Sequence, residues 1–261
     1  MIQLKLRYYF GFLISIPLLP ILFFQGKTIQ KKVPKLPEAI EPEGYIDNSF
    51  VKDLKIITIG ESTIAGVGVV KHKNGFTGAF AKELSKNLHR NIYWSVYAKS
   101  GYTANLIAKK ILAKIKEKKV DLIVIGLGGN DAFTLNSPKK WSMAINHLIQ
   151  LLQSKFPNTP IYFTNMPPIK EFPAFTKAIK FVIGNLVEIL GDFLELNAKK
   201  QNNVYYNKEI ITLKKWSKKH KLPSDNTKIY FSDGVHPSEI TYKIWGKEMA
   251  KFVAEKQKSQ E

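Results

Sequence analysis

The hydrophobic pattern divides the chain into an uncharged N-terminal run and a longer region where strand-like and helix-like segments alternate. Short apolar runs, several of them rich in β-branched residues, predict strands at 54–59, 92–98, 120–127, 161–164 and 204–206. Apolar residues at helical spacing predict helices at 75–90, 104–116, 140–156, 175–197 and 238–255. Gly184 and Gly191 are candidate break points in the fourth of these helices.

Two of these segments indicate how the elements pack. The run 120–127 is nearly all apolar, which is typical of a central parallel strand buried on both faces. In the last helix we expect an inner face made of Ile240, Ile244, Trp245, Met249 and Phe252. The alternation of strands and helices predicts an α/β fold, a three-layer αβα sandwich around a parallel sheet. The pattern alone allows several doubly wound strand orders.

The uncharged run, residues 8–24, is long enough to be the short form of a membrane-spanning helix. Pro17 and Pro20 are tolerated in such segments. A cleaved signal peptide is the alternative, but the run ends in Phe23-Phe24-Gln25-Gly26-Lys27 and lacks small residues at a cleavage site. We therefore expect an uncleaved single-pass anchor at residues 1–26.

The charges that flank this run bear on its orientation. Lys5 and Arg7 precede it, and four lysines follow it at 27, 31, 32 and 35. The positive-inside rule then favours a cytoplasmic catalytic domain by a small margin. Pro34, Pro37 and Pro42 interrupt the next segment, which predicts a linker at 27–53 and a globular domain at 54–261.

The composition excludes some classes of function. The net charge is +19, yet only Arg7 and Arg90 are arginines, and proteins that read nucleic acids rely on arginine. We therefore expect a solvated, lysine-rich surface or attraction to an anionic membrane, and no nucleic-acid partner. The chain has no cysteine, which excludes disulfides, zinc–cysteine sites and thiol nucleophiles.

Four short clusters carry candidate chemistry. They are Gly60-Glu61-Ser62, Gly101, Gly129-Asn130-Asp131 and Asp233-Gly234-Val235-His236. The first three follow predicted strands, whose carboxyl ends meet at one edge of a parallel sheet. Taken singly, each has a plain structural interpretation: Ser62 as a helix N-cap, the others as turns. Together they supply a nucleophile, oxyanion donors and an Asp/His pair, which an ester hydrolase needs.

Of the five histidines, His236 is the one that follows an aspartate by three residues in a glycine-containing loop. This spacing lets Asp233 accept from one ring nitrogen while the other faces Ser62. Candidate oxyanion donors are the backbone N–H groups of Ser62 and Gly101 and the side-chain amide of Asn130. No glycine cluster completes a dinucleotide or phosphate-loop motif and no cluster has metal-ligand spacing, so we expect neither cofactor nor metal.

These clusters, in this order, closely resemble the SGNH (GDSL-like) hydrolase family over about residues 54–255. The resemblance implies a flavodoxin-like sheet of order 2-1-3-4-5 and a metal-free mechanism. It implies a triad of Ser62, Asp233 and His236, and an oxyanion hole of Ser62, Gly101 and Asn130. The stretch 64–68 resembles a membrane-anchored bacterial subset. Glu61 stands where the family usually has Asp. Whether the longer side chain reaches the backbone donors that the Asp commonly binds in this turn is left open.

The sequence therefore predicts a serine esterase or lipase-like acyl hydrolase that acts on a small acyl ester or a lipid-like substrate. An acyltransferase of the same fold, for example one that makes N-acyl amino acids, is one alternative. A catalytically idle binding protein is the other. The segments 166–169 and 172–175 are expected either to line an apolar acyl pocket or to form a plain connecting loop.

Overall fold

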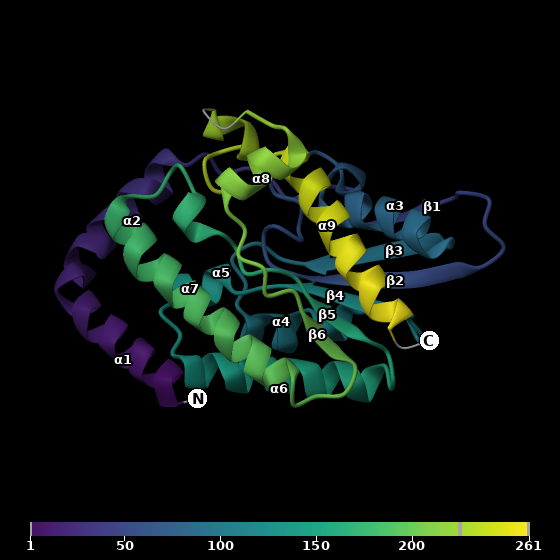
Figure 1. Ribbon diagram of the computed structural model, residues 1–261, viewed down its shortest axis with the longest axis horizontal. Coiled ribbons are helices and arrows are strands. Elements are labelled where there is room, and N and C mark those ends of the chain that lie inside the picture. The colour runs from purple at the N-terminus through teal and green to yellow at the C-terminus, as the bar shows by residue number, and fades with distance from the viewer. Residues whose placement is uncertain (1, 224–225, 260–261) are drawn as a thin grey trace.

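The computed structural model describes residues 2–223 and 226–259, and the outermost residues of the predicted anchor and domain lie outside it. In this part of the chain one sheet orders its strands β1-β3-β2-β4-β5-β6 (Figure 1). The strands are β1 Glu43–Ile46, β2 Asp53–Gly60, β3 Asn91–Ala98, β4 Leu122–Gly126, β5 Ile161–Phe163 and β6 Val204–Tyr206. The five parallel strands from β3 to β6 follow the predicted order 2-1-3-4-5.

The edge strand β1 was not predicted. It pairs antiparallel with β3 inside the segment expected to be a linker. Gly44 has no room for a side chain because it lies against the ring of Trp94, and the ring of Tyr45 stacks on Tyr93 at 4.2 Å between centroids. The strand has four residues, which alternate between exposed and half-exposed positions, so its hydrophobic pattern is too short to predict a strand. Its formation depends on pairing with β3.

Helices cover both faces of the sheet, which confirms the three-layer sandwich (Figure 1). One face carries α3 Phe76–Leu88 and α9 Glu239–Lys258, and the other carries α4 Ala104–Lys110, α6 Pro138–Lys155 and α7 Lys177–Ala198. Two shorter helices, α5 Gly129–Phe133 and α8 Leu213–His220, were not predicted. The fourth predicted helix is unbroken as α7, and the second ends early, in a 3₁₀ turn at Leu112–Lys114.

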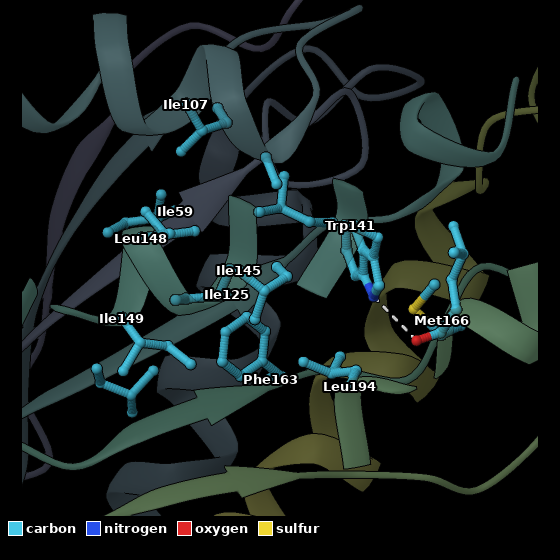
Figure 2. Packing of buried hydrophobic residues seen from close by; sticks show 14 of the residues in the cluster. Ile59, Ile107, Ile125, Trp141, Ile145, Leu148, Ile149, Phe163, Met166 and Leu194 are labelled. Carbon is cyan, nitrogen blue, oxygen red and sulfur yellow. Dashed lines mark hydrogen bonds between the residues drawn. The ribbon is translucent and has the colours of Figure 1, made fainter. Parts of the chain in front are cut away.

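The larger core cluster lies between the sheet and α4, α6 and α7. Figure 2 shows Trp141 near Met166 in this cluster. Its indole nitrogen donates to the Leu190 carbonyl at 2.9 Å. On the opposite face, Tyr242, Trp245 and Met249 of α9 are buried. Ile240, expected on this inner face, is 45% exposed because the buried face begins one residue later, at Thr241.

The apolar N-terminal run forms a longer helical segment than predicted. It spans Ile2–Lys32 as α1 Ile2–Ser15, a 3₁₀ turn at Ile16–Leu18 and α2 Leu19–Lys32, and its prolines lie at the break. This segment is long and apolar enough to cross a membrane, a test that a signal sequence near the N-terminus also passes. It lies alongside α7 (Figure 1), where Arg7 Nη1 contacts Asp192 Oδ2 at 2.9 Å.

The connection between α2 and the sheet, in the segment predicted as a linker, makes hydrogen bonds with the domain. Ala39 and Ile40 donate backbone hydrogen bonds, both at 2.9 Å, to the carbonyls of Ala65 and Val70 in the loop after β2. Glu38 accepts from the backbone N–H of Ser100 at 2.7 Å. The residues that follow the apolar helix therefore reach the loops at the carboxyl ends of β2 and β3.

Candidate active site

The carboxyl end of β2 positions Ser62. Gly60 is the last residue of this strand, and a side chain there would collide with the Gly126 carbonyl of the neighbouring strand β4. Only glycine therefore lets β2 and β4 stay paired up to this edge. Ser62 follows in a tight turn with its side chain partly exposed, at the strand-end edge where ligands bind in open α/β sheets.

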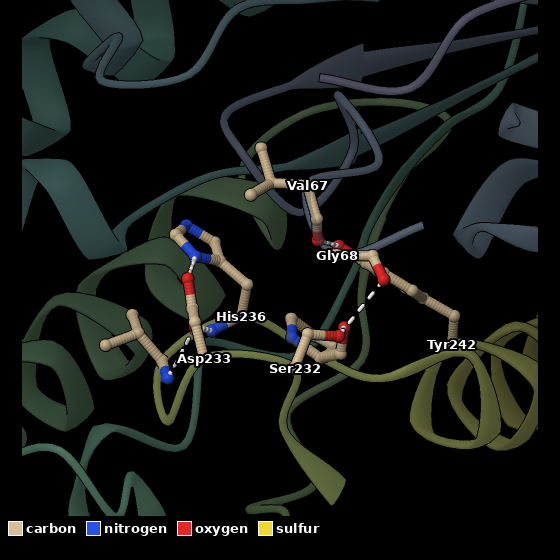
Figure 3. A network of polar contacts seen from close by, with 8 residues as sticks. Val67, Gly68, Ser232, Asp233, His236 and Tyr242 are labelled. Carbon is tan, nitrogen blue, oxygen red and sulfur yellow. Dashed lines mark hydrogen bonds and ion pairs between the residues drawn. The ribbon is translucent and has the colours of Figure 1, made fainter. Parts of the chain in front are cut away.

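Asp233 and His236 form a hydrogen-bonded pair in the loop before α9. His236 Nδ1 lies 2.7 Å from Asp233 Oδ2, and the other carboxylate oxygen accepts from the backbone N–H groups of Val235 and His236 (Figure 3). The Asp233 side chain is fully buried, whereas the His236 side chain is 21% exposed. Nδ1 is thus held as the donor to the carboxylate, which leaves Nε2 free to accept a proton.

The ionisation of Asp233 fits this arrangement. Burial alone would raise its pKa, but the hydrogen bonds from the His236 ring and from the two backbone N–H groups outweigh burial and hold the pKa below its ordinary value. Asp233 is therefore a carboxylate at neutral pH, and it can stabilise positive charge on the imidazole.

The loop that carries His236 is fastened to the loop that carries Ser62. Ser232 Oγ donates to the Gly68 carbonyl at 3.0 Å, and the buried Tyr242 hydroxyl donates to the Val67 carbonyl at 2.7 Å (Figure 3). The hydrogen bonds of the described residues do not include one between Ser62 Oγ and His236. The structure thus brings the two loops together without joining these two side chains.

The three expected oxyanion donors lie at the same strand ends. Within residues 2–223 and 226–259, no acceptor takes the backbone N–H of Ser62 or Gly101. Gly101 has a φ of +80°, which favours glycine, and the space above its Cα is open. The Asn130 amide donates one hydrogen to the Tyr102 carbonyl at 3.1 Å, which leaves the second for a ligand.

Glu61 holds Asn130 in place, a contact that the sequence left open. Its side chain is buried, with one oxygen accepting from the Gly129 N–H at 2.8 Å and the other from the Asn130 N–H at 2.9 Å. Burial raises the pKa of Glu61 to about 7, although the two backbone hydrogen bonds favour the ionised form. The longer side chain thus ties the end of β2 to the start of α5.

Asp131 makes a second connection of this kind and was missed as a positioning residue. It is fully buried and accepts from the Ala104 N–H at 2.9 Å and from the Asn136 amide at 2.9 Å. Burial raises its pKa, and these hydrogen bonds oppose the shift. The start of α4, just after Gly101, is therefore fastened to α5. The sequence signal that could have revealed these positioning roles was an acidic residue beside an otherwise apolar strand, Glu61 after the first and Asp131 after the third.

A cavity of about 1070 Å³ adjoins His236 and Gly101. Its wall includes Phe175, one of the aromatic residues for which a pocket or a plain loop had been expected. Phe172, from the same segment, is buried in the core and lines a small second cavity near Thr63. Ala174 donates to the Gly234 carbonyl at 3.1 Å, so this segment braces the Asp233–His236 loop.

Two other histidines have environments that sequence spacing did not reveal. His220 Nε2 lies 2.9 Å from Glu248, which also contacts Lys219, and these residues lie together in a surface depression between α3, α8 and α9. His72 is buried, and burial lowers its pKa to about 4. No group of His, Asp and Glu within the described ranges is placed to hold a metal ion.

Solved structures share this fold at low sequence identity. A GDSL-like protein from Bacteroides ovatus is 20% identical with a TM-score of 0.55, and the match covers 81% of this chain but 55% of that one. A family two carbohydrate esterase from Clostridium thermocellum is 16% identical with a TM-score of 0.52, over 79% of this chain and 66% of the other. A lipase/acylhydrolase from Enterococcus faecalis is 18% identical with a TM-score of 0.51, over 78% and 96%.

No curated protein matches the sequence. This chain spans about half to two thirds of the length of the first two structures. At 16–20% identity, the three likenesses show the fold alone. The model of the GDSL-like lipase/acylhydrolase family, in contrast, matches residues 58–244, which include the strands β3 to β6 and the carboxyl end of β2. Since that match covers well over half of the sequence, the chain belongs to the GDSL-like lipase/acylhydrolase family, a family of ester hydrolases.

Proposed function

We propose that the protein hydrolyses carboxylic esters through an acyl-enzyme on Ser62. His236 Nε2 takes the hydroxyl proton as Ser62 Oγ attacks the acyl carbonyl, and Asp233 stabilises the resulting imidazolium. The proton then passes to the leaving alcohol oxygen as the ester C–O bond breaks. A water molecule, deprotonated by His236, attacks the acyl-enzyme and releases the carboxylic acid and free Ser62.

The oxyanion that forms in both steps needs hydrogen-bond donors already in position. The N–H groups of Ser62 and Gly101 and the amide of Asn130 are proposed for this role. The observation that carries the proposal is the 2.7 Å Asp233–His236 pair, on a loop fastened to the Ser62 loop and beside two backbone N–H groups without an acceptor in the described part of the chain. This arrangement suits attack on an acyl carbonyl and stabilisation of the oxyanion that results.

Substitution of the proposed triad tests the mechanism. Ser62→Ala and His236→Ala should each lower turnover of a p-nitrophenyl ester by about 10⁴ to 10⁶, and the double variant little further, because the residues act as a unit. Asp233→Ala should cost somewhat less. Ser154→Ala and His147→Ala, both exposed on α6, are matched controls that should keep wild-type turnover. Near-wild-type activity of Ser62→Ala would contradict the proposed mechanism.

We also propose that the N-terminal helix stays on the mature protein as a single-pass membrane anchor, with the catalytic domain on the cytoplasmic side. Support comes from the length and hydropathy of Ile2–Lys32 and from the many large apolar side chains it exposes. N-terminal sequencing of the mature protein checks the anchor, and a chain that begins after Gln25 would overturn it. Digestion of the domain by protease outside intact cells would overturn only the orientation.

A further inference from the structure

The cavity beside His236 has one wall that belongs to the N-terminal segment. Gly26, Lys27, Ile29 and most of the residues from Gln30 to Leu36 line one side, and Gly101 and His236 line the other. The volume of about 1070 Å³ is at the upper end for small-molecule pockets. An ester held here would therefore touch the end of the apolar helix and the proposed site residues Gly101 and His236 at the same time.

Apolar side chains make up much of this wall. Val67, Phe133, Phe175, Ile179 and Val235 come from the domain, and further apolar residues come from the segment after α2. Phe133 is 43% exposed although it packs against Phe175 at 5.3 Å between ring centroids. Large exposed aromatic groups beside a site that cleaves esters fit a bound hydrocarbon chain.

The charged residues that line the cavity all carry the same sign. They are Lys27, Lys31 and Lys35, and none of the Asp and Glu residues that the structure describes lines it. Within the described ranges these three lysines form no ion pair, whereas the nearby Lys99 contacts Glu38 at 3.0 Å. Lys27 Nζ lies 4.3 Å from the centre of the Phe23 ring. Unpaired ammonium groups on an apolar cavity complement a negatively charged amphiphile.

The place of these lysines in the helix indicates where that amphiphile comes from. The turns before Lys27 expose Ile21, Phe23 and Phe24, which suit the hydrocarbon of a bilayer. Lysines at the end of such a helix reach the level of the lipid headgroups. If the proposed anchor crosses a membrane, the cavity therefore opens at the bilayer surface.

We infer that the substrate is an acyl ester of an anionic membrane lipid. Its acyl chain lies along the apolar wall with the ester carbonyl near Ser62 and His236, and its phosphate-bearing headgroup contacts Lys27, Lys31 and Lys35. This inference rests on the proposed function, because it names the substrate class of the same site.

The test compares two lysophospholipids with the same acyl chain in mixed micelles of a neutral detergent. One carries a net negative glycerol-phosphate headgroup and the other a zwitterionic choline-phosphate headgroup. The full-length protein should have a kcat/KM at least about tenfold higher for the anionic one. The variant Lys27→Gln/Lys31→Gln/Lys35→Gln should bring the ratio close to one, since each lysine near a lipid surface contributes measurably to anion attraction. Lys82→Gln/Lys86→Gln/Lys251→Gln, which removes three exposed charges from α3 and α9, should leave the ratio unchanged.

Several outcomes would overturn the inference while leaving the proposed function intact. One is a ratio near one in the wild type, and another is a ratio that the cavity variant does not change. A third is an equal fall in the control variant, which would mean that net charge alone draws the protein to anionic micelles. A fourth is Ser62-dependent cleavage of a p-nitrophenyl ester with no cleavage of either lysophospholipid. Preference for a monomeric, short-chain anionic ester over the micellar lipid would likewise overturn a membrane source. Loss of the Ser62 dependence itself would instead contradict the proposed function.

Discussion

The strand-end edge of the sheet and the N-terminal helix are attached to the rest of the molecule in opposite ways. At the strand ends, Glu61 and Asp131 are buried carboxylates that accept hydrogen bonds from backbone N–H groups. Beside α7, Arg7 pairs with Asp192, and these side chains are 49% and 45% exposed. The strand-end edge is thus fastened by buried carboxylates. The start of the helix is held by an ion pair open to solvent, and farther along Leu18, Leu22 and Ile29 pack against the core as partly buried side chains.

This difference indicates what each region requires from its surroundings. A buried carboxylate is costly unless hydrogen bonds compensate it, so each such residue fixes the backbone that it contacts. The result is an edge whose donors are preorganised by the protein alone. An exposed ion pair contributes little. The domain leaves many large apolar side chains of this helix exposed, as the proposed membrane anchor requires.

The largest expected effect that tests this comparison is kinetic. Asn130→Ala should lower kcat by about 10² to 10³, or roughly 2.7–4 kcal/mol, because it removes an oxyanion donor. Its melting temperature should change little, since the partly exposed amide makes one hydrogen bond to the protein.

Asn136→Ala is the matched control. Its amide donates to the buried Asp131, so this variant should lose stability and keep most of its kcat. Steady-state kinetics and thermal unfolding of both variants distinguish a catalytic role of Asn130 from a structural one. A large fall in melting temperature with a small kinetic loss in Asn130→Ala would make Asn130 a structural turn residue.

The next effect is a pH dependence of stability that comes from Glu61. Its pKa is raised by burial from an ordinary 4.5 to about 7, so between these values the folded state binds more protons than the unfolded state. The free energy of unfolding should therefore fall as pH rises from about 4.5 to 7, by roughly 3 kcal/mol from this group. Glu61→Gln cannot titrate and should lack this contribution.

Urea unfolding of the wild type and Glu61→Gln at a series of pH values isolates the contribution of this one group, because all other titrations are shared. The wild type should lose stability relative to the variant as the pH rises. Two curves that stay parallel from pH 4.5 to 7 would show that Glu61 has the same pKa in the folded and unfolded states.

Periodicity and turn residues were enough to predict the parallel sheet and most helices, because those elements bury long apolar faces. Strand β1 and helices α5 and α8 are short and depend on neighbours distant in sequence, so no local sequence pattern predicted them. The places of Ser62, Gly101 and Asn130 at one edge were expected from the parallel order, and those of Asp233 and His236 from the family resemblance. The positioning roles of Glu61 and Asp131 could not be predicted, because a carboxylate in such a turn can accept hydrogen bonds from many different backbone donors.

The smallest expected effect concerns the N-terminal helix. Arg7→Gln removes the contacts to Asp192 and Glu188, and because Arg7 and Asp192 are about half exposed the loss should be below about 1 kcal/mol. The melting temperature of the full-length protein in detergent should then shift by no more than about 2–4 °C, with ester hydrolysis unchanged. Asp131→Ala is the contrasting variant. It leaves the buried Ala104 N–H without its acceptor, which should cost about 1–3 kcal/mol. If Arg7→Gln destabilises the protein as much as Asp131→Ala does, the helix is an integral part of the folded domain, and the contrast between the two regions does not hold.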